Sequence, residues 1–94
     1  MALTEPQAKV LGALSTLGPW TRFTVRELVT ATGLPTDRTR AVLLRLTYDG
    51  LVRRSGKTPA DYWISRTGRA VIASPTYREY RTRRDTATVP RSKH

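Results

Sequence analysis

The chain has 94 residues, the size of one small domain, and this length excludes a two-domain enzyme. Its 17 Lys and Arg residues outnumber its 7 Asp and Glu residues, and the formal net charge of +10 predicts an anionic partner. The absence of cysteine excludes disulfide frameworks, thiolate catalysis and zinc ribbons, and it predicts a cytoplasmic protein.

Two capping boxes mark the first two predicted helices. Residues 4–7 (Thr-Glu-Pro-Gln) begin a helix that we expect to end at Leu17, before the stop signal Gly18-Pro19. Residues 24–27 (Thr-Val-Arg-Glu) begin a second helix of about eight residues, which Gly33 closes. A helix this short is expected to depend on packing against its neighbours.

The third predicted helix runs from Thr36 to about Asp49, with Thr36 and Asp37 as its cap and Gly50 as its stop. The helical spacing assigns its buried face to Thr39, Val42, Leu43 and Leu46. At 100° per residue, the positions directly opposite are Asp37, Ala41 and Leu44, with Arg38 and Arg45 on one flank and Arg40 on the other. We therefore expect a polar and basic outward surface with a small residue at its centre.

Two segments after Gly50 have the composition of β-strands. Residues 51–54 and 62–65 are separated by a loop rich in turn-forming residues, and this pattern predicts a hairpin. Ser65 is expected to cap a fourth helix over residues 66–73, and Ser74-Pro75 should break or restart that helix.

The predicted domain covers residues 1–75, and a basic segment covers residues 76–94. This segment has six basic and two acidic residues, which give it a net charge of 6 − 2 = +4, so we expect it to be partly helical or disordered. Tyr77 and Tyr80 are three residues apart, and a short helix there would pack them on a partner chain.

No catalytic, cofactor or metal pattern is present in the sequence. The single histidine is His94, the carboxylates are scattered, and the glycines match neither a phosphate loop nor a dinucleotide fingerprint. The sequence also lacks a membrane-spanning apolar run and a signal-peptide pattern. We therefore expect no enzyme, no cofactor, no metal site and no membrane partner.

The order of helix, helix, turn, helix and basic hairpin indicates a winged helix-turn-helix. This is a mostly helical α+β fold with a two-stranded β wing, in which the third helix enters the major groove and the wing 51–65 contacts the flanking backbone. The helix over residues 36–49 would be about 21 Å long, and the major groove, about 12 Å wide, admits one such helix.

The candidate DNA contacts divide into two groups. A guanidinium fork can bind guanine and a small side chain can touch a thymine methyl, so the base-contacting candidates are Thr36, Asp37, Arg38, Arg40 and Ala41. The candidates for phosphate contact are Arg22, Thr24, Arg45, Arg53, Arg54, Lys57 and Thr58. Successive strand residues point to opposite faces, so at most one of Arg53 and Arg54 should face DNA.

Structural alternatives exist for the same residues. Exposed helix arginines are common, Thr36 and Asp37 could act as caps, and Ala41 could simply favour the helix. The aromatic residues could stack on single-stranded bases, but core packing is the better interpretation for Trp20, Phe23, Tyr62 and Trp63. A solvated tail is the alternative to non-specific backbone attraction for Arg78, Arg81, Arg83 and Arg84.

Two passages resemble a known family in the same order. The passage from residues 34–39 (Leu-Pro-Thr-Asp-Arg-Thr) through residues 46–54 is similar to the recognition-helix and strand passage of MarR-type and PadR-type repressors. Residues 62–70 are similar to their second wing strand and following helix, which typically read Tyr-x-Leu-Thr-x-x-Gly. The resemblance covers roughly residues 10–72. It implies a homodimeric regulator that binds specific sequences of double-stranded DNA and is usually a repressor of nearby promoters.

This chain departs from that family at its ends. Members usually dimerise through long terminal helices, whereas little precedes Thr4 here and a Pro-interrupted basic stretch follows Ala73. Little room is left for an effector pocket, so a small-molecule effector is doubtful. Two other functions remain open: a winged-helix module that binds an acidic protein, and a non-specific architectural or single-strand nucleic-acid binder.

Overall fold

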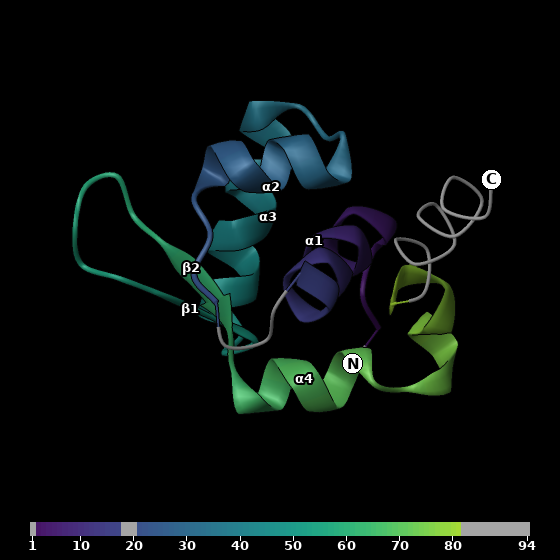
Figure 1. Ribbon diagram of the computed structural model, residues 1–94. Coiled ribbons are helices and arrows are strands. Elements are labelled where there is room, and N and C mark those ends of the chain that lie inside the picture. The colour runs from purple at the N-terminus through teal and green to yellow at the C-terminus, as the bar shows by residue number, and fades with distance from the viewer. Residues whose placement is uncertain (1, 18–20, 82–94) are drawn as a thin grey trace, which may run out of the picture.

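The computed structural model describes residues 2–17 and 21–81. The elements follow one another as three helices, a two-stranded wing, a fourth helix and a 3₁₀ turn (Figure 1). Their bounds are α1 Glu5–Leu17, α2 Val25–Thr32, α3 Thr36–Tyr48, β1 Val52–Arg54, β2 Tyr62–Ile64, α4 Arg66–Ile72 and η1 Pro75–Tyr77. The predicted element order is therefore confirmed.

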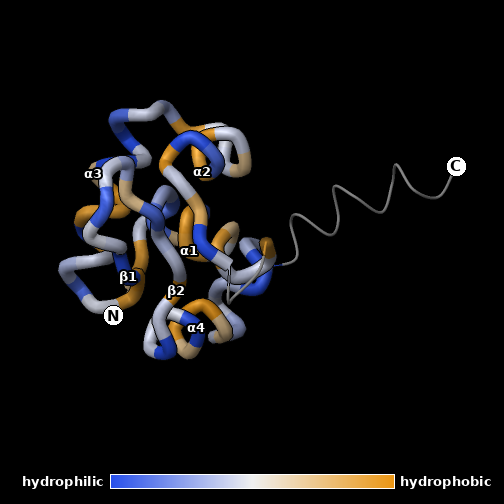
Figure 2. The backbone as a smooth tube through the Cα atoms, turned by 60° about the vertical axis from the view of Figure 1, so that its left-hand side comes forward, coloured by the Kyte–Doolittle hydropathy of each residue, from blue (hydrophilic) through white to orange (hydrophobic). Residues whose placement is uncertain are grey.

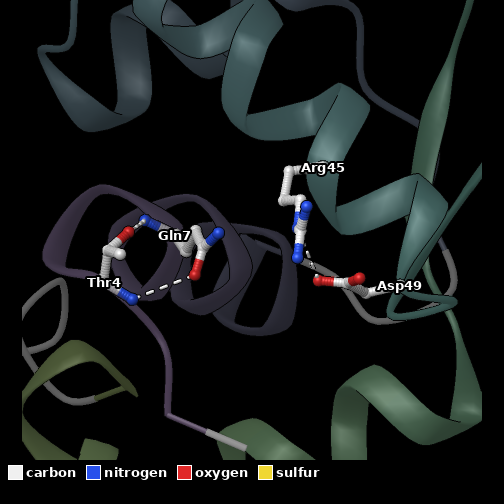
Figure 3. A network of polar contacts seen from close by, with 4 residues as sticks. All are labelled: Thr4, Gln7, Arg45 and Asp49. Atoms are coloured by element: carbon white, nitrogen blue, oxygen red, sulfur yellow. Dashed lines mark hydrogen bonds and ion pairs between the residues drawn. The ribbon is translucent and has the colours of Figure 1, made fainter.

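Helix α1 is the centre of the fold. It contacts α2, α3, α4 and β2, and its buried apolar residues are Ala8, Val10, Leu11 and Leu14. The predicted capping box is present, because the Thr4 N–H donates to Gln7 Oε1 (2.9 Å) and the Gln7 N–H donates to Thr4 Oγ1 (3.3 Å; Figure 3). In Figure 2 apolar colouring gathers where α1 lies against its neighbours. The predicted stop at Gly18-Pro19 lies outside the described residues.

The helix-turn-helix pair α2–α3 begins as predicted and differs at its turn. Thr24 Oγ1 accepts from the Glu27 N–H (3.2 Å), the Glu27 carboxylate accepts from the Thr24 N–H (2.8 Å), and Gly33 ends α2 with a φ of 75°. The predicted cap of α3 by Thr36 and Asp37 is wrong. Pro35 occupies the N-cap position with no side-chain hydrogen bond, because the Leu34-Pro35 turn places Thr36 already inside the helix.

Helix α3 buries the face predicted from its periodicity, namely Thr39, Val42, Leu43 and Leu46. The Thr39 hydroxyl satisfies its own hydrogen bond inside the core by donating to the Pro35 carbonyl (3.0 Å). At the other end, Gly50 adopts a φ of 80°, and the Leu51 N–H donates to the Leu46 carbonyl (2.9 Å). This glycine turn directs the chain from α3 into the wing.

The wing is an antiparallel hairpin in which Val52 faces Ile64 and Arg54 faces Tyr62. A further backbone pair, which the sequence did not predict, joins the loop before α2 to β2. The Phe23 N–H donates to the Tyr62 carbonyl (2.8 Å), and the Tyr62 N–H donates to the Phe23 carbonyl (2.7 Å). The root of the wing is therefore bound on both edges of β2, while its loop projects away from the helices (Figure 1).

Helix α4 is attached to the wing root by Ser65. Its hydroxyl accepts from the Gly68 N–H (3.0 Å), as predicted for a cap, and also donates to the Gly50 carbonyl (2.7 Å). The Ser65 N–H donates to the Leu51 carbonyl (3.0 Å). The turn after α3 and the start of α4 are consequently held as one unit.

The segment after α4 restarts at Ser74-Pro75 as predicted, but its tyrosines pack on their own chain. Tyr77 is buried in the core, and its hydroxyl accepts from the Leu3 N–H (2.9 Å). Tyr80 lies against Gly12 of α1, where a side chain would come within 2.8 Å of the Tyr80 carbonyl oxygen. The expectation of packing on a partner chain is wrong, because α1 supplies this surface.

Residues 78–81 are helical, and residues 82–94 of the predicted basic segment lie outside the described residues. The predictions made for Trp20, Arg83 and Arg84 also concern residues outside the described ranges. Within residues 2–17 and 21–81, no helix is long and apolar enough to span a bilayer.

Candidate nucleic-acid interface

A groove runs between the helix-turn-helix pair and the wing. Helices α2 and α3 form one wall, and the wing, with residues of β1, its loop and β2, forms the other. The predicted contact residues that line it are Thr24, Thr36, Arg40, Arg54 and Thr58. The structure thus brings together residues up to 34 positions apart in the sequence, on the side of the molecule from which the wing projects (Figure 1).

The outward half of α3 is exposed as predicted. Asp37, Arg38, Arg40 and Ala41 are all exposed. No carboxylate pairs with Arg38 or Arg40 in the part of the chain that the structure describes. The two guanidinium groups lie on opposite flanks of the helix, so α3 presents positive charge on both sides of its outermost line.

The outermost line of α3 is more apolar than predicted. Leu44 is 74% exposed and Tyr48 is 82% exposed. Among the described residues, these are the large apolar side chains that are exposed to solvent. With Ala41 they follow a spacing of three and four residues along one face. The predicted polar and basic outward surface is therefore correct for its flanks and wrong for its centre line.

Arg45 is held by the carboxylate of the residue that caps its helix. Its Nε lies 3.3 Å from Oδ2 of Asp49, the C-cap of α3 (Figure 3), and its guanidinium carbon lies 5.7 Å from the centre of the Tyr48 ring. The Arg45 side chain is 63% exposed, so this is a surface ion pair of small net stability. The Arg45 side chain is exposed enough to contact a DNA phosphate, but its ion pair with Asp49 reduces the positive charge that Arg45 presents.

In the wing, Lys57 makes a similar pair with Asp61, whose Oδ2 lies 3.0 Å from Lys57 Nζ. Both strand arginines are exposed; Arg54 lines the groove that contains Arg40, and both arginines line a second hollow beside Thr47 of α3. Arg53 is the strand neighbour of Trp63. Arg54 is therefore the strand arginine that shares the groove with Arg40, whereas Arg53 lies beside α3 only in the second hollow.

Arg22 stacks on an aromatic residue at the base of the wing. Its guanidinium carbon lies 4.4 Å from the centroid of the Trp63 ring. Trp63 is half-buried, and Phe23 and Tyr62 pack against the core from partly buried positions. Core packing is confirmed for Phe23 and Tyr62, whereas Trp63 serves as a platform for Arg22.

Several residues of this surface were not among the predicted contacts. Among them, Arg26, Leu44 and Thr47 line the groove, and Tyr48 extends the outer line of α3. The Thr47 hydroxyl oxygen is buried and has no hydrogen-bond partner within residues 2–17 and 21–81. The helical wheel of α3 places Thr47 on the side of Arg40, and this signal could have identified it.

The described residues contain no group of three or more His, Asp or Glu side chains that could hold a metal ion. The surface offers cations, hydroxyl groups and a short apolar line. The chemistry of this surface is suited to binding a polyanion.

Solved structures of bacterial regulators share this architecture. Bordetella bronchiseptica BpsR matches with a TM-score of 0.72 and 26% identity over 86% of this chain and 59% of that chain. A MarR family protein from Bacillus stearothermophilus matches with a TM-score of 0.63 and 28% identity over 98% of this chain and 62% of that chain. A MarR family regulator from Silicibacter pomeroyi matches with a TM-score of 0.67 and 22% identity over 90% and 62% of the two chains.

These similarities confirm the winged helix-turn-helix fold and its MarR-type form. Several of the similar structures are described as MarR family transcription regulators. The chain spans about three fifths of the length of these structures. No family model matches the chain, and no curated protein matches it.

One description bears on the predicted lack of an effector. The DNA binding of BpsR is described as regulated by 6-hydroxynicotinic acid. The fold is therefore compatible with small-molecule control in that protein, and this weakens the doubt that we derived from the ends of the sequence.

Proposed function

We propose that the chain is a sequence-specific, double-stranded DNA-binding transcription regulator. In this proposal α3 enters the major groove and the wing contacts the flanking backbone. The observation that carries the proposal is the groove in which unpaired Arg40 of α3 and unpaired Arg54 of the wing face the same surface. The MarR-type fold of the solved structures supports it.

The dimensions of α3 suit this role. Its 13 residues make a helix about 20 Å long. An α-helix with its side chains is about 10 to 12 Å across, which fits a major groove about 12 Å wide. Arg38 and Arg40 would read guanine edges, Asp37 would accept from a cytosine amino group, and Thr36 would contact a neighbouring base. Arg54, Thr58, Lys57 and the remaining cations would set the register on phosphates.

We further propose that the protein acts as a homodimeric repressor of promoters in the cytoplasm, with residues 1–75 as the DNA-binding unit and residues 76–94 as an auxiliary basic segment. The support is the resemblance of residues 10–72 to MarR-type repressors. Two copies would then read half-sites about 34 to 36 Å apart in an inverted repeat.

The decisive experiment is selection of bound duplexes from a random library, followed by affinity measurements on the selected and shuffled sequences. We expect an inverted repeat and a loss of about 10³-fold or more on shuffling. Arg40→Ala should cost about 1 to 3 kcal/mol at one base position, whereas Arg54→Ala should weaken all sequences alike and lower the salt slope by about 1. Equal affinity for selected and shuffled duplexes would refute specific readout.

Arg66→Ala is the matched control. Arg66 is an exposed arginine on α4, which lies across α1 from α2 (Figure 1). The variant removes the same charge as Arg40→Ala but leaves the groove unchanged. It should retain the base preference of the wild type.

A protein-interaction role is the second candidate, and the exposure of Leu44 and Tyr48 favours it. Retention of a partner after nuclease treatment, together with no duplex binding at low salt, would support that role. Steep salt dependence without sequence preference would instead indicate a non-specific architectural binder.

A further inference from the structure

The outermost line of α3 is formed by Ala41, Leu44 and Tyr48, which we call the α3 ridge. Leu44 and Tyr48 are more than 70% exposed, whereas thirteen other apolar residues form a closed core. No described element packs on this ridge, because the buried face of α3 lies on its opposite side. The ridge is therefore an apolar surface available to a partner.

Positive charge surrounds this ridge. Arg38 and Arg40 flank it without ion pairs, and Arg54 lies across the groove from it. Asp37 at the N-terminal end is the one exposed, unpaired carboxylate of α3 among the described residues. A matching partner needs an apolar line at its centre and anionic walls on both sides. Double-stranded DNA has this arrangement, because thymine methyl groups lie in the major groove between two rows of phosphates.

We propose that the α3 ridge reads the 5-methyl groups of thymines in the major groove, an inference that rests on the DNA-binding function proposed above. Ala41 and Tyr48 are seven positions apart, or about 10.5 Å along the helix. At about 3.4 Å per base step, this length covers roughly three base pairs. The ridge thus selects a run of thymine-containing pairs beside the positions that the arginines read.

The three residues of the ridge differ in what they contribute. Ala41 allows the helix backbone to approach the bases, and Leu44 offers the branched apolar group that packs on a methyl. The Arg45 guanidinium lies over the Tyr48 ring, with its carbon 5.7 Å from the ring centre. The same guanidinium forms an ion pair with Asp49. Tyr48 is therefore positioned at the C-terminal end of the ridge, where it meets the last methyl of the run.

The test replaces thymine by deoxyuridine, which lacks only the methyl group, at single positions of the duplex that the protein selects from a random library. Fluorescence anisotropy measures the affinity of the full chain for each duplex. Burial of one methyl contributes about 0.8 kcal/mol, so deoxyuridine should weaken wild-type binding about four-fold at one to three thymines of each half-site. Other thymines should be insensitive.

Leu44→Asn is the matched variant, because it keeps the side-chain size but removes the apolar surface at an exposed position. In this variant the penalty at one thymine should disappear, while the preference that Arg40 imposes should persist. Tyr48→Ala should remove the penalty at a different thymine. Circular dichroism confirms that both variants remain folded.

Several results would overturn the inference. Equal wild-type affinity for thymine and deoxyuridine at all positions would show that the methyl groups are not read. A penalty that survives in both variants would assign the reading to another part of the chain. In either case a preferred duplex still exists, so the proposed function stands. If the library yields no preferred duplex, the proposed function fails first, and the ridge would then serve a protein partner.

Discussion

Gly68 stands where the start of α4 passes under the root of the wing, and Gly68→Ala tests how tightly these two parts fit. A methyl group at this position would overlap the carbonyl oxygen of Leu51 and lie 2.9 Å from Ile64 Cγ1. The Leu51 oxygen is backbone and also accepts from the Ser65 N–H, so it cannot rotate away. The first turn of α4 must move instead.

The expected cost follows from three contributions. Overpacking in a filled core costs about 1 to 3 kcal/mol. Movement of α4 weakens the hydrogen bonds of Ser65 to Leu51 and Gly50, each of which contributes about 1 kcal/mol. The better helix propensity of alanine offsets about 1 kcal/mol. We therefore expect a net loss of about 3 kcal/mol, which for a domain of this size lowers the Tm by about 15 °C.

Thermal and urea unfolding followed by circular dichroism measure this loss. Gly56→Ala is the control, because no atom lies within 4 Å of the added methyl and the backbone there is not left-handed. Its stability should stay within about 0.5 kcal/mol of the wild type. Gly50→Ala has the same open space but a φ of 80°, so it should cost about 1 kcal/mol.

The order Gly68, then Gly50, then Gly56 separates steric contact from backbone conformation. If Gly68→Ala unfolds with the midpoint of the wild type, close approach is not the reason for glycine at this position, and the packing of α4 against the wing root is misassigned. A larger cost for Gly56→Ala than for Gly68→Ala would contradict the same reasoning.

Three further substitutions test individual contacts. Thr24→Ala removes the α2 capping box and should lower the urea-derived stability by about 1 kcal/mol; no change would mean that the box contributes nothing. Tyr77→Phe removes the hydroxyl that accepts from the Leu3 N–H and should cost about 1 kcal/mol, which calorimetry would detect. Asp49→Asn frees Arg45 and should tighten DNA binding about two-fold at low salt with little change in stability, and weaker binding would contradict the charge argument.

The local elements of the fold were predictable because local interactions determine them. The capping boxes at Thr4 and Thr24 and the left-handed Gly33 are satisfied within a few residues of chain. The buried side of α3 follows from a periodicity that any packed helix of this sequence must obey. Neighbouring residues therefore carried enough information to assign these features.

Contacts between distant segments were not predictable in the same way. The pairing of Phe23 with Tyr62 needs a loop and a strand 39 residues apart to meet. The packing of Tyr80 on Gly12 depends on where α1 and the C-terminal segment cross. The spacing of Tyr77 and Tyr80 correctly indicated that these side chains pack on another surface. The same spacing fits a partner chain and the chain's own α1 equally well.

The candidate site shows the same division. The sequence alone determined that Arg38, Arg40 and Ala41 lie on the side of α3 opposite its core, because a helix with one buried face must expose the other. Only the tertiary structure decided that Arg54, and not Arg53, lines the groove with Arg40, because that arrangement depends on how the wing is turned against α3. Periodicity specifies the side of an element on which a residue lies, whereas the packing of whole elements determines what lies across from it.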